Sequence, residues 1–209
     1  MRIKICGVTT PDDVVMCADA GADAIGINFH PGSPRYVDPR QAMPLVRAMP
    51  PLMASIGVFV GIPLRQACAI AFQLGLRGVQ WHGEQHETGD TFPFSYIPAF
   101  RIRDAASLEG INKFLARCPQ PPGAVLVDSY VDGVEGGTGM TAPWHLLADY
   151  RPAVPLILAG GLKPENVAEA IQQVHPWAVD VASGVESSPG RKDASKVRDF
   201  VAAAKAAAS

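Results

Sequence analysis

Two residues that can move protons end apolar, strand-like segments far apart in the sequence. In the segment Arg2 to Cys6, alternation places Lys4 and Cys6 on one face and two isoleucines on the other. The segment 124–128 ends in the same way on Asp128. A thiol and a carboxyl group at the carboxyl ends of two strands could serve as base and acid across one pocket. This pairing favours an acid–base isomerase.

Eight strand-like segments alternate with helical patterns, and these elements must position the two groups. The strands are expected at 2–6, 23–29, 53–60, 77–82, 97–102, 123–128, 154–159 and 178–182. Helices are expected near 11–21, 39–48, 63–74, 104–117, 143–149, 164–174 and 193–206, whereas the connection 83–96 reads poorly as a helix. This order predicts an α/β protein, a (β/α)₈ TIM barrel with residues 1–209 as one domain. An open doubly wound sheet competes, but no glycine fingerprint for a dinucleotide follows the first strand.

Composition narrows the classes of partner. The 209 residues are 48% apolar, and 18 Lys and Arg against 20 Asp and Glu give a net charge of −2 without a run of like charge. Nucleic acid and membrane surfaces are therefore not expected partners. Neither a signal peptide nor a bilayer-spanning segment is found, so we expect a cytoplasmic protein with a small ligand. Monomer and homodimer remain open alternatives.

The cysteines have no C-x-x-C spacing. Their wide separation argues against a zinc site and a disulfide framework, so we expect free thiols and no metal. They are Cys6, Cys17, Cys68 and Cys118.

Polar residues collect at the carboxyl ends of the strands on the predicted inner face. A barrel interior with a purely structural role is usually filled with branched apolar side chains, so this bias predicts a ligand site over the strand ends. Gln80 and His82 could instead bond each other at the rim, and a structural role competes for Asp180. The predicted inward set is Lys4, Cys6, Ala24, Gly26, Asn28, Gly78, Gln80, His82, Leu126, Asp128, Ala178 and Asp180.

Three glycine-bearing turns follow late strands, at 136–139, 159–161 and 183–186. Glycine lets the backbone approach a ligand and aim N–H groups at it, and loops after strands 7 and 8 of such barrels commonly bind phosphate. Each glycine alone could merely serve a tight turn. Together they predict a phosphorylated substrate.

Other roles compete at the three side chains most suited to chemistry. Cys6 could be an inert buried thiol, and Asp128 could cap the following turn. Arg35 lies in the loop 31–37, where prolines flank Ser33 and favour a fixed conformation. A planar guanidinium suits a carboxylate, so anchoring of a substrate competes with a solvated surface arginine and is favoured.

Eight short motifs lie in chain order on the predicted strands and the turns that follow them. They are KICG at 4–7, SPRYV at 33–37, GVFV at 57–60, VQWHG at 79–83, DS at 128–129, GGTG at 136–139, AGGL at 159–162 and DVASGVE at 180–186. Together these motifs resemble those of the phosphoribosylanthranilate isomerase family of tryptophan biosynthesis. Departures from the family pattern occur at Trp81, at Ala182 and in the segment 140–144, and put the helix after strand 6 in question.

The resemblance implies a (β/α)₈ barrel that performs an Amadori rearrangement of N-(5-phosphoribosyl)anthranilate without a cofactor. Cys6 would be the general base, Asp128 the general acid and Arg35 the contact to the anthranilate carboxylate. For this chemistry we expect burial to raise the pKa of Asp128 and Lys4 to favour the Cys6 thiolate. Gln80, His82 and Asp180 are candidate substrate-binding residues. The implied phosphate-binding residues are Gly137, Thr138, Gly139, Gly160, Gly161, Ser183 and Gly184.

Two other functions remain to be separated. A histidine-pathway isomerase has a similar barrel, but that family has Asp at the end of strand 1, where Cys6 stands here. A non-catalytic sensor of a phosphorylated ligand would bind without turnover.

Overall fold

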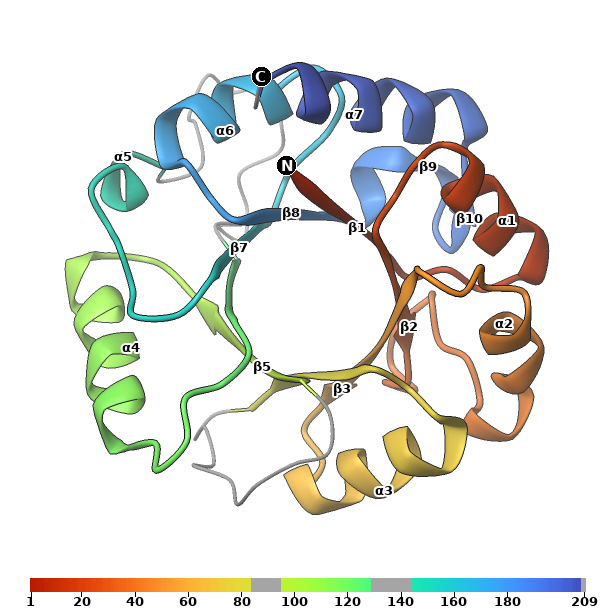
Figure 1. Ribbon diagram of the computed structural model, residues 1–209, viewed down its shortest axis with the longest axis horizontal. Coiled ribbons are helices and arrows are strands. Elements are labelled where there is room, and N and C mark those ends of the chain that lie inside the picture. The colour runs from red at the N-terminus through yellow and green to blue at the C-terminus, as the bar shows by residue number, and fades with distance from the viewer. Residues whose placement is uncertain (84–94, 129–143, 208–209) are drawn as a thin grey trace.

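A closed barrel of eight parallel strands forms the centre of the computed structural model, which describes residues 1–83, 95–128 and 144–207. Each strand pairs with its neighbours in chain order, and β8 closes on β1, so the (β/α)₈ prediction is confirmed (Figure 1). The strands are β1 Arg2–Cys6, β2 Ala24–Asn28, β3 Ala54–Val60, β4 Gly78–His82, β5 Ser95–Arg101, β6 Val125–Asp128, β7 Leu156–Ala159 and β8 Ala178–Val181.

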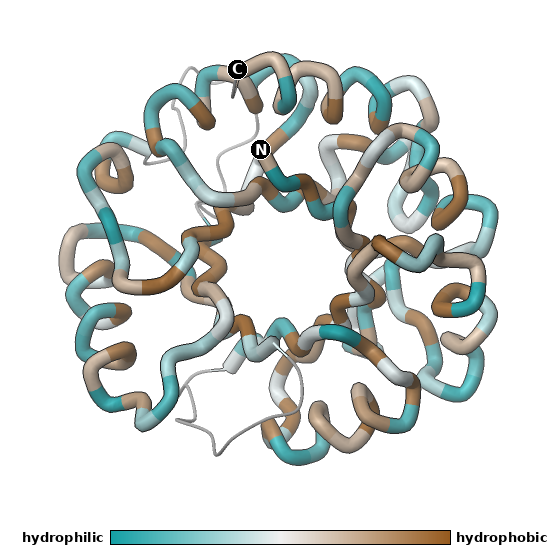
Figure 2. The backbone as a smooth tube through the Cα atoms, viewed as in Figure 1, coloured by the Kyte–Doolittle hydropathy of each residue, from teal (hydrophilic) through white to brown (hydrophobic). Residues whose placement is uncertain are grey.

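Helices surround the barrel and cover its outer face (Figure 1). Thr10 caps α1, because its side chain accepts a 3.1 Å hydrogen bond from the Asp13 N–H, and Pro11 opens the helix. Hydrophilic and hydrophobic residues alternate along these outer helices (Figure 2). The α-helices are α1 Pro11–Asp19, α2 Met43–Arg47, α3 Leu64–Leu74, α4 Ala105–Arg117, α5 Trp144–Leu147, α6 Val167–Val174 and α7 Ala194–Ala206.

The alternation along β1 places its isoleucines in the core outside the barrel, which is distinct from the apolar cluster inside it. Ile3 and Ile5 are buried between the strands and the helices, and such burial contributes about 1.5–3 kcal/mol for each side chain. A smaller apolar cluster fills the barrel interior, where the predicted inward residues Leu126 and Ala178 lie. The rest of that cluster is Ile56, Ile97, Ala99, Ala124, Ile157 and Ala159.

Gly26 makes room for the polar side chains of β1. It pairs with Cys6 across β1 and β2, and a Cβ at this position would lie 2.8 Å from the Cys6 Sγ and 3.0 Å from the Lys4 Nζ. The absence of a side chain at this position of β2 leaves room for the Lys4 ammonium inside the barrel.

Two of the predicted elements differ from the observed ones in their boundaries. The helix expected at 39–48 divides into a 3₁₀-helix, Pro39–Gln41, and α2, because Pro44 has no N–H with which to continue a single helix. Strand β5 begins at Ser95, so the end of the connection predicted at 83–96 belongs to a strand. Residues 84–94 of that connection lie outside the described residues.

A short 3₁₀-helix and a hairpin follow β8, and the sequence pattern did not predict them. The 3₁₀-helix Ser183–Val185 leads into β9, Glu186–Ser188, which pairs antiparallel with β10, Arg191–Lys192. Strands of three and two polar residues carry no hydrophobic period that would reveal them. None of the helices in the described ranges is long and apolar enough to cross a membrane.

Candidate active site

A pocket of about 340 Å³ lies at the carboxyl ends of the strands. It contains the thiol at the end of β1 and the carboxyl group at the end of β6, which the sequence predicted to share one pocket. The predicted site residues that line it are Cys6, Arg35, Gln80, His82, Asp128, Gly160, Gly161, Asp180 and Ser183. The barrel therefore collects candidate groups from most of the chain into one volume of the size typical of small-molecule sites.

Burial dominates the ionisation of Cys6. Removal from water raises the pKa of the thiol, because the charged thiolate loses its hydration. Lys4 and Lys192 lower it and Asp180 raises it, so the pKa is above its ordinary value. Lys4 favours the thiolate as expected, but its effect on the pKa of Cys6 does not outweigh that of burial.

Lys4 and Asp180 form an ion pair inside the barrel. The residues are register partners on β1 and β8, and the Lys4 Nζ lies 2.9 Å from the Asp180 Oδ1. Their side chains are 6% and 7% exposed. Burial lowers the pKa of Lys4, but Asp180 and Cys6 raise it by more. The ammonium thus stays charged next to the candidate base.

Asp128 is the last residue of β6 and pairs with Ala159 of β7. Its backbone carbonyl accepts a 3.1 Å hydrogen bond from the Ile102 N–H, which fixes the strand end. In the closed strand order, β7 and β8 separate β6 from β1 on one side. The Asp128 and Cys6 side chains consequently enter the pocket from well-separated parts of its wall.

Gln80 and His82 bond each other on β4, as the sequence analysis anticipated. The Gln80 Nε2 lies 2.8 Å from the His82 Nε2. The direction of this hydrogen bond is set by the tautomer of the His82 ring. The Gln80 Oε1 is buried and has no hydrogen-bond partner within the described residues.

The glycines in the loops after β7 and β8 have different structural roles. Gly160 and Gly161 have φ of 91° and 64°, a region that other residues rarely adopt, and a Cβ on Gly161 would meet nothing within 4 Å. A Cβ on Gly184 would clash with the carbonyl of Leu162, so this glycine lets the loops after β7 and β8 touch. Gly184 is not among the pocket-lining residues. The predicted residues Gly137, Thr138 and Gly139 lie outside the described residues.

Arg35 reaches the pocket from the loop after β2, but its closest partner was not predicted. The Nε and Nη2 atoms donate to the two carboxylate oxygens of Glu186 at 2.7 and 2.6 Å. Lys192 binds the same carboxylate at 2.8 Å. Sequence reasoning included Glu186 in a motif but gave it no role, and missed Lys192. The available signal was a pair of opposite charges in the segment just after the last strand.

All four cysteines are free thiols, as expected. Within the ranges that the structure describes, no three His, Cys, Asp or Glu side chains are grouped so that they could hold a metal ion.

This fold and pocket define a (β/α)₈-barrel enzyme with its reactive groups at the carboxyl ends of the strands. The family model of N-(5'-phosphoribosyl)anthranilate isomerase matches residues 3–203. A relative with that name from Geobacter metallireducens is 42% identical over 207 residues, which cover 99% of this chain and 100% of the relative. The chain therefore belongs to the N-(5'-phosphoribosyl)anthranilate isomerase family.

Solved structures agree with this assignment. The crystal structure of phosphoribosyl anthranilate isomerase from Thermotoga maritima has a TM-score of 0.85 and 34% identity, with 99% of each chain covered. A structure of such an isomerase in complex with reduced 1-(o-carboxyphenylamino)-1-deoxyribulose 5-phosphate has a TM-score of 0.82 and 33% identity, also with 99% of each chain covered. The activity is thus the isomerase step of tryptophan biosynthesis, and the histidine-pathway alternative is set aside.

Proposed function

We propose that Cys6 and Asp128 are the general base and general acid of an Amadori rearrangement. The substrate is N-(5-phosphoribosyl)anthranilate and the product is 1-(2-carboxyphenylamino)-1-deoxyribulose 5-phosphate. The observation that carries the proposal is that this thiol and this carboxyl group line the same pocket.

The first step opens the ribose ring. Protonated Asp128 gives its proton to the ring oxygen while the anilino nitrogen donates its electron pair to C1, so the C1–O bond breaks and a protonated Schiff base forms. The ring oxygen leaves as a hydroxyl group. A half-buried carboxyl group that lines the pocket at the end of its strand is placed to give this proton.

The second step moves a proton from C2. The Cys6 thiolate takes it, the released electron pair forms the C1–C2 double bond, and the nitrogen becomes neutral. The enolamine then gains a proton at C1 and loses one from the C2 hydroxyl, which gives the ketone. Lys4 supports this step, because its charge favours the thiolate.

The ends of the substrate bind different parts of the rim. Arg35 binds the anthranilate carboxylate with the guanidinium N–H groups that Glu186 does not occupy. The loops with Gly160, Gly161 and Ser183 hold the phosphate at the pocket. Gly184, Gly137, Thr138 and Gly139 are further proposed phosphate-binding residues.

The sugar lies between these two ends. Gln80, His82 and Asp180 contact its hydroxyl groups. The Oε1 of buried Gln80, which has no hydrogen-bond partner in the part of the chain that the structure describes, is suited to accept one such bond. The protein works in the cytoplasm.

A fluorescence assay separates this function from that of a sensor. Phosphoribosylanthranilate is followed by its emission in the presence of the protein, and product is measured independently by mass spectrometry. We expect catalytic loss of the substrate with equimolar appearance of the deoxyribulose phosphate. Stoichiometric binding without conversion would contradict the proposal and favour the sensor.

A further inference from the structure

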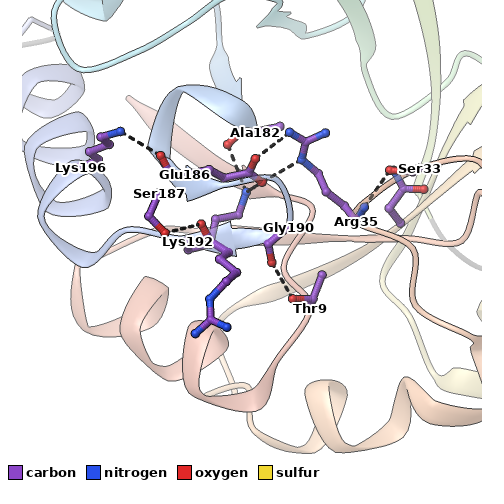
Figure 3. Close-up of polar contacts among 11 residues, drawn as sticks. Thr9, Ser33, Arg35, Ala182, Glu186, Ser187, Gly190, Lys192 and Lys196 are labelled. Carbon is purple, nitrogen blue, oxygen red and sulfur yellow. Dashed lines mark hydrogen bonds and ion pairs between the residues drawn. The ribbon is translucent and has the colours of Figure 1, made fainter.

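The hairpin of β9 and β10 is fastened to the loops that follow β1 and β2. The Thr9 hydroxyl donates a 2.8 Å hydrogen bond to the Gly190 carbonyl in the hairpin turn (Figure 3). Gly190 has φ of 82°, and a Cβ there would lie 2.8 Å from the Pro34 carbonyl. The turn therefore packs closely against the residue that precedes Arg35.

Glu186 opens this hairpin and holds two cations with one carboxylate. Its two oxygens accept the parallel bonds from Arg35, and the Lys192 ammonium binds the Oε1 (Figure 3). The Glu186 side chain is 4% exposed and that of Lys192 is 0% exposed. A buried carboxylate in a bidentate bond fixes both the position and the plane of a guanidinium.

The stem of Arg35 is fixed as well. A Cβ on Gly7 would clash with the Arg35 Cδ, so the stem lies against the backbone that immediately follows Cys6. The two hydrogen bonds to Glu186 use the Nε and Nη2 atoms of Arg35 and do not involve its Nη1. A long side chain that is already ordered loses less conformational freedom when it binds a ligand.

Lys192 links Glu186 to the loop that follows β8. Its Nζ also donates a 3.1 Å hydrogen bond to the carbonyl of Ala182, the residue before Ser183 in the phosphate loop. Glu186 is thus bonded on one side to the candidate carboxylate anchor and on the other, through Lys192, to the candidate phosphate loop.

We propose that Glu186 is a positioning residue that orients Arg35 for recognition of the substrate's aromatic carboxylate. This inference rests on the proposed function, in which Arg35 binds that carboxylate. Glu186 does not contact the reacting atoms. It sets how strongly the site distinguishes a ligand with the ring carboxylate from one without it.

The test compares two inhibitors in wild type and in Glu186→Gln. One is the reduced product analogue with its ring carboxylate, and the other is the same compound with an unsubstituted phenyl ring. For Glu186→Gln we expect the Ki ratio of the two to fall about tenfold, as for one weakened charge-assisted contact. KM should rise by a similar factor while kcat changes much less. Glu109→Gln, in an exposed ion pair with Lys113 on α4, is the matched control and should leave the ratio unchanged.

An Arg35→Met variant tests the carboxylate contact of Arg35 separately from the positioning role of Glu186. If Arg35→Met leaves the ratio of Ki values unchanged, the proposed carboxylate contact itself is wrong. If Arg35→Met abolishes the preference and Glu186→Gln preserves it, only the positioning role of Glu186 is wrong. Tighter binding of the carboxylated inhibitor by Glu186→Gln would also overturn the inference, since Glu186 would then be a competitor for Arg35.

The double variant Glu186→Gln/Lys192→Met is a control for a folding defect in Glu186→Gln. It removes both charges of the buried pair, so that Lys192 is not left without its counter-charge. With a native circular dichroism spectrum, this variant should show the same loss of carboxylate preference. A folded double variant with the wild-type ratio would contradict the proposal.

Discussion

The Lys4 ammonium donates a 2.9 Å hydrogen bond to Asp180 and also contacts the Cys6 thiol. One cation inside the barrel therefore interacts both with a carboxylate on β8 and with the proposed base on β1. Lys4 and Asp180 act on the Cys6 thiol in opposite directions: Lys4 lowers the pKa of the thiol, and Asp180 raises it. Variants of the two residues should accordingly shift the pH dependence in opposite directions.

Lys4→Met should move the alkaline rise of kcat/KM to higher pH. The base must be a thiolate, so kcat/KM increases as the pH passes the pKa of Cys6 in the free enzyme. Without the cation that pKa rises, and a shift of about one pH unit or more is expected. The pH profile of kcat/KM measures it, with exposed Lys113→Met as a control. An unchanged rise would mean that Lys4 has no influence on the catalytic proton transfer.

Asp180→Asn should have the opposite effect. Loss of the negative charge removes a contribution that raises the pKa of Cys6 and frees Lys4 to interact with the thiolate. The alkaline rise should therefore begin at lower pH. Alkylation of Cys6 as a function of pH, resolved by mass spectrometry of its peptide, measures this without substrate. A rise at higher pH in this variant would contradict the electrostatic assignment.

Gly184→Ala should destabilise the protein and weaken phosphate binding. The new Cβ would clash with the Leu162 carbonyl and force the two loops apart, at a cost of about 1–3 kcal/mol in the free energy of unfolding. Urea denaturation and inhibition by inorganic phosphate measure the two effects. Gly110→Ala on α4 is the matched control: nothing lies within 4 Å of its Cβ, so a gain of about 0.5–1 kcal/mol is expected. Equal stability of Gly184→Ala and wild type would show that the loops can separate without cost.

The sequence predicts the barrel and its pocket well because both follow from local patterns. The alternation in β1 determines that Cys6 faces inward, and parallel strands in a closed barrel then bring it to the same end as Asp128. The cap at Thr10 is likewise a local effect. The division of the segment 39–48 near Pro44 is also local, but a single helix was predicted there.

The partner of Arg35 cannot be predicted in this way. Glu186 lies 151 residues further along the chain, and no period or turn signal links the two. The ion pair of Lys4 with Asp180, at a separation of 176 residues, depends in the same way on barrel closure and on the space left by Gly26. Side-chain pairing over such separations is set by tertiary packing.

The central claim is tested most directly by steady-state turnover of Cys6→Ala and Asp128→Asn. Each variant removes one proton-transferring group, and we predict a fall in kcat of about 10²- to 10⁴-fold for each. Both should keep the circular dichroism spectrum of the wild type and bind the reduced product analogue. Wild-type kcat in both folded variants would contradict the assignment of this thiol and this carboxyl group as the base and the acid.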